Sequence, residues 1–390
     1  MRICYISSMF PTKRAPHNGV FITRRIEALK ELGINVDAYA LVREESFLVR
    51  LLRKITRKEQ KEVFSDVIYT DNSDIIYRTI KIKLNFVEFI INFLTCENYY
   101  AWKAARTCDR DISDAFDLVH AHWLFPTGKA AIIFAKKKHV PVFVTCHGSD
   151  INYYMKLNRY RKSCQWTLLH ADEVEFVSQR LMDTAKMLGG EWKAAHVLPN
   201  GIVNHRLNYS KQKQHVIGFV GNLIDVKRVD CFPELFRRLH CKYHDLTFVI
   251  VGDGERGDWL KKQLNGLPVV FTGRVSQDQV LDEMEKMMLM ILPSRNEGWP
   301  CVVLEAYSCG TPVIGSSCGG IPEAVDDENF IVADNEDLKI FTDELYNKIS
   351  DYLDNKIPFD QQKLIEKSNN FKWNRLQSIE TGFYHNYVKD

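Results

Sequence analysis

Apolar and polar residues alternate along the chain in short blocks, a pattern typical of proteins that combine strands and helices. The first blocks predict a buried strand over residues 2–7, an amphipathic helix over 21–32 and a second strand over 34–41. The loop between the first strand and the helix is long and contains Gly19 close to the helix start. A glycine there lets a bound group approach the backbone, although an ordinary loop glycine explains it equally well.

The alternation of apolar strands and helices continues for about two hundred residues. Further strands are predicted over 117–123, 140–150, 171–178 and 195–202, with helices over 127–138, 158–170 and 179–188 between them. A strand that is repeatedly followed by a helix indicates a parallel sheet with helices on both faces.

The polar run 204–214 predicts a linker, after which the pattern starts again. Strands are predicted over 216–223, 246–254, 268–275, 288–292 and 313–314, and helices over 229–243, 256–264, 277–286, 301–309, 337–354 and 360–388. The chain of 390 residues is also too long for one ordinary core. We therefore predict two α/β domains with doubly wound parallel sheets, residues 1–205 and 206–371, with a ligand cleft between them.

Composition narrows the class of protein. Apolar residues at 45% and charged residues at 26% are ordinary for a folded protein, and a net charge of +2 gives no reason to expect nucleic acid. The ten cysteines form no CxxC pair, which indicates a reducing compartment. The N-terminus lacks the apolar core of a signal peptide, and segment 86–94 is too short to cross a bilayer. The expectation is a cytoplasmic protein.

Segment 48–61 differs from the rest of the chain. Its six cations interleave with leucine, valine and isoleucine, and Lys81 and Lys83 follow further on. On a helix this spacing gives a basic face beside an apolar one, as in membrane-surface segments. A solvated helix that packs its leucines on the domain is the alternative.

The stretch 289–325 contains the strongest candidate site. A buried strand ends at Pro293, a polar loop follows, and Pro300 precedes a helix, where its missing N–H matters least. A strand, a glycine-containing loop and a helix start present backbone N–H groups at the carboxyl end of a sheet, which suits an anion. Glu297 lies before this helix and Glu305 on it, so both acids can face one ligand.

Other candidates lie where predicted strands end. Lys227 follows the first strand of the second domain and can neutralise a phosphate, although an ordinary surface lysine is the simpler explanation. His147 ends a strand beside Gly-Ser-Asp, a structural or a functional position. His120 and His122 point to the same side of one strand, but no third ligand is spaced for a metal site. We expect no metal and no cofactor.

These motifs together resemble those of the retaining glycosyltransferases of family 4, which have the GT-B fold. The run NEGWPCVVLEAYSCGTPVIGSSCGGIPEAV resembles their E-x7-E signature, with Glu297 and Glu305 as the two acids. HAHWLFPTG, VTCHGSD, LPNGI, VGNLIDVK, FVIVGDG and FTGRV follow in the order that the family shows, so that the resemblance covers nearly the whole chain. It implies two Rossmann-like domains facing a cleft, with the C-terminal helix 372–390 crossing back to the first domain.

The resemblance also implies roles for individual residues, carried over position by position. Glu297 would approach the donor sugar, Glu305 would hold the ribose, and Lys227 would hold the diphosphate. His147 would bond the sugar's outer hydroxyl. The remaining implied donor-site residues are Gly19 against the diphosphate, Arg274 near the base, and Gly298, Trp299, Cys301 and Val302 around the sugar and phosphates.

The chain departs from the family pattern at one position. Many relatives have an arginine after the glycine of the second domain's first strand, where this chain has Asn222. A neutral amide stabilises a phosphate less than a guanidinium does. Either Arg228 compensates, or Lys227 and the backbone hold the diphosphate.

The function implied is transfer of a hexose-type sugar, with retention, from a UDP or GDP donor to a glycan acceptor that is lipid-linked and used in cell-surface polysaccharide synthesis. Segment 48–61 would then dock on anionic lipid at the inner face of the plasma membrane. A GT-B nucleotide-sugar epimerase, which needs no acceptor, is one alternative. A catalytically silent GT-B scaffold is another, although the retained Glu297, Glu305, Lys227 and His147 argue against it.

Overall fold

The computed structural model describes residues 1–12, 18–50, 77–203 and 213–388. These residues form two compact units, which are described separately: Met1–Asn200 with Trp373–Asp390, and Gly201–Lys372. The basic segment predicted to meet a membrane lies outside the described residues beyond position 50, and the predicted linker lies outside them between 204 and 212. Within the described ranges, no helix is both long enough and apolar enough to cross a membrane.

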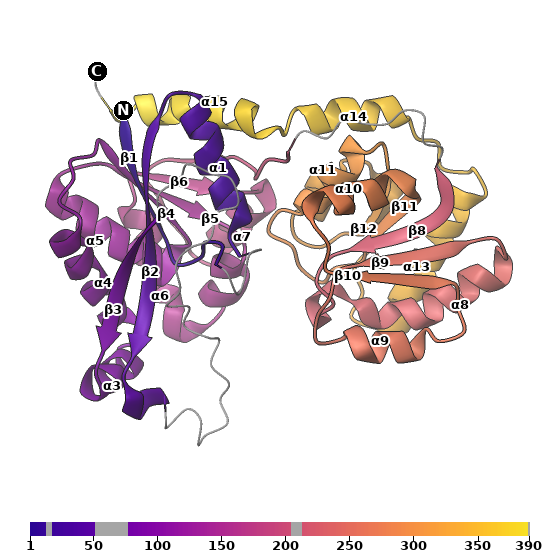
Figure 1. Cartoon of the computed structure of the whole chain (residues 1–390), viewed down its shortest axis with the longest axis horizontal. Helices are drawn as coiled ribbons and strands as arrows, with labels where there is room; N and C mark the ends of the chain where they lie inside the picture. Colours follow the sequence, from indigo (N-terminus) through magenta and orange to yellow (C-terminus); the bar gives the residue numbers. More distant parts are fainter. Residues whose placement is uncertain (13–17, 51–76, 204–212, 389–390) are drawn as a thin grey trace. The chain divides into compact units, whose positions relative to one another are not determined.

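The N-terminal unit is built on a sheet of seven parallel strands in the order β3-β2-β1-β4-β5-β6-β7 (Figure 1). Its strands are β1 (Arg2–Ser7), β2 (Asn35–Glu45), β3 (Tyr77–Leu84), β4 (Leu118–His122), β5 (Val142–Cys146), β6 (Glu173–Phe176) and β7 (Ala195–Val197). Its α-helices are α1 (Val20–Glu31), α3 (Phe86–Leu94), α4 (Asn98–Asp111), α5 (Lys129–Lys138), α6 (Asn158–His170), α7 (Gln179–Met187) and α15 (Trp373–His385).

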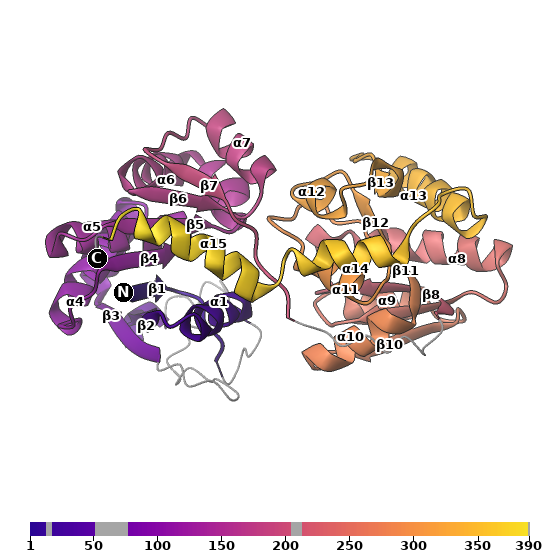
Figure 2. The ribbon, with the colours of Figure 1, turned by 90° about the horizontal axis from the view of Figure 1, so that it is seen from above.

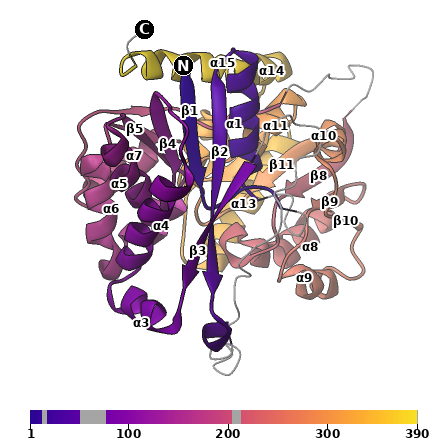
Figure 3. The same ribbon diagram turned by 60° about the vertical axis from the view of Figure 1, so that its left-hand side comes forward.

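Helices cover both faces of this sheet, as the alternating pattern predicts. Figure 3 shows α1 on one side of β1 and β2, and α4 and α5 on the other. Helix α15 packs against α1 across the N-terminal unit, although it comes from the C-terminal end of the chain (Figure 2). Buried residues of β1, α1 and β2, among them Ile3, Tyr5 and Ile26, form one hydrophobic core with Tyr384 of α15.

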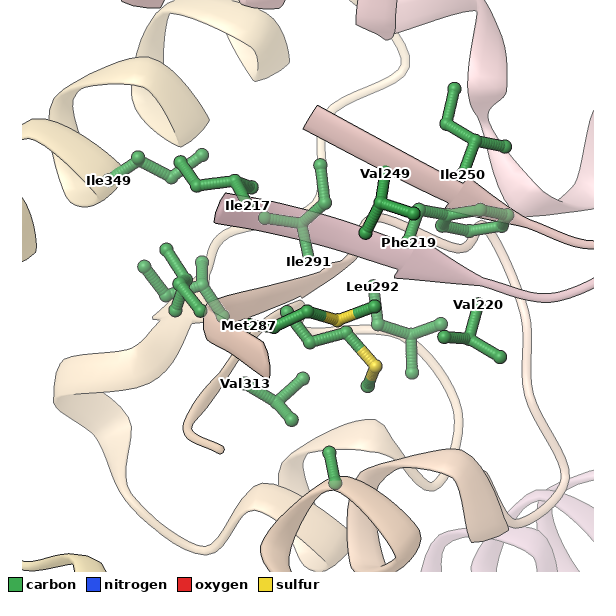
Figure 4. Close-up of a cluster of buried hydrophobic side chains, with 14 of the residues drawn as sticks. Ile217, Phe219, Val220, Val249, Ile250, Met287, Ile291, Leu292, Val313 and Ile349 are labelled. Carbon is green, nitrogen blue, oxygen red and sulfur yellow. The ribbon is translucent and has the colours of Figure 1, made fainter. Parts of the chain in front are cut away.

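The second unit has a sheet of six parallel strands in the order β10-β9-β8-β11-β12-β13. Its strands are β8 (Gln214–Val220), β9 (Thr247–Val251), β10 (Val269–Gly273), β11 (Met287–Leu292), β12 (Val313–Ser316) and β13 (Ile331–Val332). Its helices are α8 (Phe232–Lys242), α9 (Gly257–Gln263), α10 (Gln277–Lys286), α11 (Cys301–Ser308), α12 (Ile321–Val325), α13 (Leu338–Leu353) and α14 (Gln361–Asn369). Side chains such as Ile217, Phe219, Val249, Ile291 and Val313 fill its core (Figure 4).

The predicted α/β class with two doubly wound parallel sheets is therefore confirmed. The helical stretch predicted over 360–388 consists of two helices, α14 and α15, which belong to different units. Between them Phe371 accepts a hydrogen bond of 2.8 Å from the Ile202 N–H, and Lys372 pairs with Ile202 as a β-bridge. Extended pairing of this kind is incompatible with a continuous helix.

Strand order fixes where each sheet can bind a ligand. The order reverses between β1 and β4 in the first unit and between β8 and β11 in the second. Ligands of open parallel sheets bind beyond the carboxyl ends of the strands that flank such a reversal. The loops that follow β1, β4, β8 and β11 are therefore the places to look for chemistry.

Candidate active site

The two loops at the reversal point of the second sheet contain the acid and the lysine predicted from the sequence. Lys227 ends the short 3-10 turn η3 (Asp225–Lys227) after β8, and Glu297 lies in the loop after β11. The Lys227 Nζ atom lies 2.5 Å from the Glu297 Oε1 atom, and the two side chains are only 18% and 14% exposed. An ion pair held at a sheet reversal point, partly shielded from water, provides a fixed cation for an anionic ligand and a fixed carboxylate for hydroxyl groups.

Arg295 holds these two loops together, a role that sequence reasoning missed. Its backbone N–H donates to the Val226 carbonyl at 2.7 Å, and its guanidinium donates to the Asp225 carbonyl at 2.6 Å. The same guanidinium forms a two-point ion pair with Asp230 at 2.8 and 3.2 Å. Lys227 and Glu297 therefore meet because the backbones that bear them are joined, and the short spacing between Arg295 and Glu297 was the only sequence signal.

A glycine turn after β12 fixes the Glu297 backbone. Gly319 has a φ of +54°, and a Cβ atom at this position would lie 2.0 Å from the Glu297 carbonyl oxygen. The next residue, Gly320, donates its N–H to that oxygen at 3.0 Å. Only glycine allows so close an approach in this conformation, so the turn sets the position of the acid.

The second acid, Glu305, lies one helical turn inside α11. Its carboxylate is half-buried and accepts a hydrogen bond of 2.9 Å from the Gln277 side chain of α10. Burial raises the pKa of Glu305 to about 7, against the lowering effect of that hydrogen bond. A carboxylate that has lost water without gaining a cation is suited to accept hydrogen bonds from ligand hydroxyl groups.

The raised pKa of Glu305 predicts a pH-dependent stability. Between pH 4.5 and 7 the folded protein retains a proton that the unfolded chain releases, so the free energy of unfolding falls as pH rises through this window and stays reduced above it. We expect Glu305→Gln, which keeps the shape, to raise the unfolding free energy by about 1–3 kcal/mol at pH 8 and by little at pH 4.5.

Thermal melting from pH 4.5 to 8.5 measures this effect. Glu255→Gln is a matched control, since Glu255 is an exposed acid of the same unit. An equal change in melting temperature at both ends of the range would contradict the buried-carboxylate explanation.

The start of α11 brings together the other residues predicted around the sugar. Gly298 and Trp299 precede Pro300, and Cys301 and Val302 form the first turn of the helix. The Trp299 ring lies 5.5 Å from the Phe371 ring, and Trp299 and Cys301 are partly buried against the core. A helix start is electropositive, which favours an anion at this point.

Three other predicted residues of the same unit have surroundings that differ from those of the Lys227–Glu297 pair. Asn222 and Arg274 are exposed, after β8 and β10. Arg228 is buried, its guanidinium lies 4.0 Å from the centre of the Phe341 ring, and it pairs with Asp334 at 2.5 Å. These contacts give Arg228 a structural role. That Arg228 also helps Lys227 to hold the diphosphate stays a prediction.

In the N-terminal unit, the predicted histidine lies beyond β5 and is bonded to a second one. The His147 Nε2 atom lies 2.8 Å from the His122 Nδ1 atom, and the His122 ring stacks on His120 at 4.9 Å. The prediction that His120 and His122 point the same way is thus confirmed. Burial lowers the pKa of His147 to about 3, so its imidazole is neutral and donates through one nitrogen only.

Gly19 begins α1 near this histidine pair. Its φ is +65°, and a Cβ atom there would lie 2.3 Å from the Met9 carbonyl oxygen, so the turn requires glycine. Phe21, two residues further on, has its ring 4.7 Å from the His147 ring. The loop after β1 and the loop after β5 therefore bring Gly19 and His147 into one neighbourhood of the N-terminal unit.

A buried polar network beside the histidines joins α15 to the sheet. The Arg25 guanidinium of α1 bonds both carboxylate oxygens of Glu380 at 3.1 and 3.0 Å and pairs with Glu175 of β6. All three side chains are 2% exposed or less. Burial would raise the pKa of Glu175, but Arg25 and the hydrogen-bonded His196 outweigh burial and hold it below its usual value.

No group of three potential metal ligands converges among the residues that the structure describes. Glu297 is paired with Lys227, Glu305 is bonded to Gln277, and His122 is bonded to His147.

Sequence comparison places both units in known families. A family model described as Glycosyltransferase Family 4 matches residues 19–206, and one described as Glycosyl transferases group 1 matches residues 214–354. The putative teichuronic acid biosynthesis glycosyltransferase TuaC of Bacillus subtilis is 29% identical over 341 residues, which are 82% of each chain. The N-acetyl-alpha-D-glucosaminyl L-malate synthase of Bacillus anthracis is 25% identical over 243 residues, 58% of this chain and 62% of that protein.

Solved structures share the fold over the full length. The lipopolysaccharide outer core galactosyltransferase WaaB superposes with a TM-score of 0.67 at 17% identity, covering 99% of this chain and 100% of that one. Sucrose-phosphate synthase from Thermosynechococcus elongatus gives a TM-score of 0.70 at 16% identity, covering 99% and 98%. Anabaena HepE in complex with UDP gives 0.66 at 16%, covering 99% and 100%.

Proposed function

Because the chain belongs to glycosyltransferase family 4 and is a glycosyltransferase of the GT-B fold, we propose that it transfers a hexose-type sugar from a UDP or GDP donor to a glycan acceptor, with retention. The observation that carries this proposal is the Lys227–Glu297 pair at the reversal point of the second sheet. Relatives support the biological setting, since TuaC is named for teichuronic acid and WaaB for lipopolysaccharide. We propose a lipid-linked acceptor in cell-surface polysaccharide synthesis.

The proposed donor site uses the charges described above. The diphosphate takes Lys227 and the start of α11, because a leaving nucleoside diphosphate gains negative charge as the glycosidic bond breaks. Glu297 accepts hydrogen bonds from the sugar hydroxyl groups, and Glu305 from those of the ribose. In the free protein Lys227 is bonded to Glu297. A bound diphosphate therefore competes with Glu297 for the lysine.

The roles predicted for the other site residues are also part of this proposal. Arg274 is proposed to lie beside the base, and Trp299 and Cys301 to select the sugar. Gly19 and His147 are the residues of the N-terminal unit that we propose to contact the donor. Since His147 is neutral, its proposed part is to bond a sugar hydroxyl group rather than to supply a charge.

Binding of nucleotides tests the proposed donor site. We expect UDP or GDP, and their common sugar conjugates, to raise the melting temperature, because a ligand that binds only the folded state stabilises it. Lys227→Ala is expected to weaken binding of the stabilising nucleotide by about 1–3 kcal/mol, the range for a charge-assisted hydrogen bond, or about 5- to 150-fold in Kd.

Calorimetric titration gives the Kd of each variant. Lys262→Ala is the control, because Lys262 is an exposed lysine on α9 of the same unit. An unchanged Kd in Lys227→Ala would place the diphosphate elsewhere, and the absence of any stabilising nucleotide would remove the proposed function.

A further inference from the structure

In helix α3 of the N-terminal unit, the apolar side chains face solvent and the polar side chains face the protein. Its polar residues face the protein: Asn92 is 3% exposed and accepts a hydrogen bond of 2.7 Å from the Tyr100 N–H, and Glu88 bonds residues of α4. Its apolar residues face solvent, with exposures of 37% for Phe86, 62% for Val87, 41% for Ile90, 37% for Ile91, 63% for Phe93 and 72% for Leu94. A helix on the surface of a globular protein normally has the opposite arrangement.

Local contacts hold α3 in this orientation. Asn85 and Glu88 form a reciprocal capping box, with both hydrogen bonds at 2.9 Å. The Glu88 carboxylate also accepts a hydrogen bond of 2.9 Å from the Tyr99 hydroxyl and pairs with Lys103 at 2.5 Å. The acid of α3 is thus neutralised on the inner side of the helix, and the exposed apolar face is a fixed feature of the fold.

A second exposed apolar pair lies at the same end of the sheet. Glu45 of β2 is paired with Leu84 of β3, so the residues that follow each strand begin side by side. Phe47 and Leu48, which follow β2, are 72% and 56% exposed. Residues 47–50 form a short helical turn, which Figure 1 shows at the same lower end of the N-terminal unit as α3. We call α3 with Phe47 and Leu48 the apolar tip.

Cations lie beside the apolar tip and on the adjoining helix α4. The Arg159 guanidinium lies 5.7 Å from the Phe93 ring, and Lys83 is 78% exposed. The Arg106 guanidinium lies 4.8 Å from the ring of Trp102, a residue of α4 that is itself 43% exposed. Arginine and tryptophan side chains of this kind fit the boundary between lipid tails and headgroups.

Acids near the apolar tip are engaged with cations. The Glu44 carboxylate lies 3.2 Å from the Lys81 ammonium and 3.9 Å from that of Lys83, so that one acid faces two cations, and Glu88 pairs with Lys103. The chain leaves the described structure after Arg50, at this end of the sheet, and its next eleven residues include five cations and one acid. The sequence that continues from this end of the sheet therefore has an excess of positive charge.

We propose that the apolar tip docks on the surface of an anionic lipid bilayer. Its apolar side chains would enter the layer beneath the headgroups, while Arg159, Arg106 and Lys83 would meet the anionic headgroups. A second copy of this chain fits less well, because two such surfaces would bring like charges together. The docking surface needs neither sugar donor nor acceptor, so its test is independent of the proposed function.

Vesicle co-sedimentation tests the proposal with the whole chain. The vesicles are pure phosphatidylcholine, or phosphatidylcholine with 30% phosphatidylglycerol as the anionic probe. We expect at least tenfold stronger partitioning onto the anionic vesicles, lost at high salt because exposed charges are screened. The triple variant Val87→Ser/Phe93→Ser/Leu94→Ser is expected to bind them at least tenfold more weakly. Equal binding of wild type and triple variant, or no preference for anionic vesicles, would overturn the proposal.

Matched controls separate docking from general hydrophobicity. Met187→Ser/Val270→Ser removes two apolar side chains that are 79% and 60% exposed elsewhere, and should leave vesicle binding unchanged. Lys83→Gln/Arg159→Gln should weaken binding to anionic vesicles only. Melting curves of the variants should match that of the wild type, because the replaced groups are exposed.

Sedimentation equilibrium without lipid tests whether a second copy of this chain, rather than a bilayer, covers the apolar tip. A dimer that forms in the wild type and is lost in the triple variant would assign the apolar tip to self-association and overturn the lipid proposal. A monomer in both, with the vesicle results above, supports it.

Discussion

Replacing Glu297 with glutamine is expected to reduce kcat by about 10²–10³-fold, the loss typical of removing one fixed electrostatic group from an active site. The same change should leave binding of the bare nucleoside diphosphate unchanged or tighter. The reason is that Lys227, which is bonded to Glu297 in the free protein, no longer has a carboxylate that competes with the phosphates. Turnover and nucleotide binding should thus move in different directions.

Initial rates with donor and acceptor, together with calorimetric Kd values, measure both effects. Lys227→Ala provides the contrast, since it should weaken both turnover and binding. Glu336→Gln serves as the control, an exposed acid of the same unit. A Glu297→Gln enzyme with near-normal kcat would remove Glu297 from the reaction.

Product analysis in the same reactions distinguishes sugar transfer from the two alternative functions, an epimerase and a silent scaffold. An epimerase would convert the donor with no glycan present, whereas the proposed enzyme needs an acceptor. A scaffold would bind nucleotide without turnover. The anomeric configuration of the product, read by nuclear magnetic resonance, tests retention.

Arg25→Met is expected to destabilise the N-terminal unit by about 3–5 kcal/mol, because it leaves Glu175 and Glu380 buried and without their cation. For a unit of this size the loss corresponds to roughly 6–20 °C in melting temperature. Since Glu380 belongs to α15, this helix should also detach first, so its backbone amides should exchange faster with deuterium and its peptide bonds should be cut earlier by protease.

The adjacent residue supplies a close control. Arg24 is 45% exposed and pairs with Glu27 on the same helix, so Arg24→Met should cost well under 1 kcal/mol. Adding Glu175→Gln and Glu380→Gln to Arg25→Met should recover much of the lost stability, because no unpaired charge then remains buried. If Arg24→Met and Arg25→Met melt alike, the network does not hold α15 in place.

The alternation of apolar runs was enough to predict the two sheets, because strands buried on both faces are nearly continuous in apolar residues. Strand β3 was missed for the opposite reason. It lies at the sheet edge, and its exposed positions bear Arg78, Lys81 and Lys83. These charges make the strand resemble a basic surface segment more than a strand of a buried sheet. The break between α14 and α15 depends on pairing with Ile202, a contact that no local pattern contains.

The chemistry of the site was predictable from motifs, whereas the contacts that position it were not. Glu297, Glu305 and Lys227 stand in recognisable runs, and the structure places Lys227 against Glu297. Gln277, which bonds Glu305, is 28 residues away, and Glu380 is 355 residues from Arg25. Such partners are set by the packing of elements that are distant along the chain, and a single sequence contains no record of them.

The return of α15 to the N-terminal unit affects how the protein is made. The first two hundred residues emerge from the ribosome before Glu380 and Tyr384 have been synthesised. A nascent chain at that stage therefore has Arg25 without Glu380, and His120 without Tyr384. The unit that begins first is therefore completed last, after the second unit has been synthesised. A premature stop near the end of the gene would leave the second unit whole and the first one open, a chain that proteases and chaperones can distinguish from the finished enzyme.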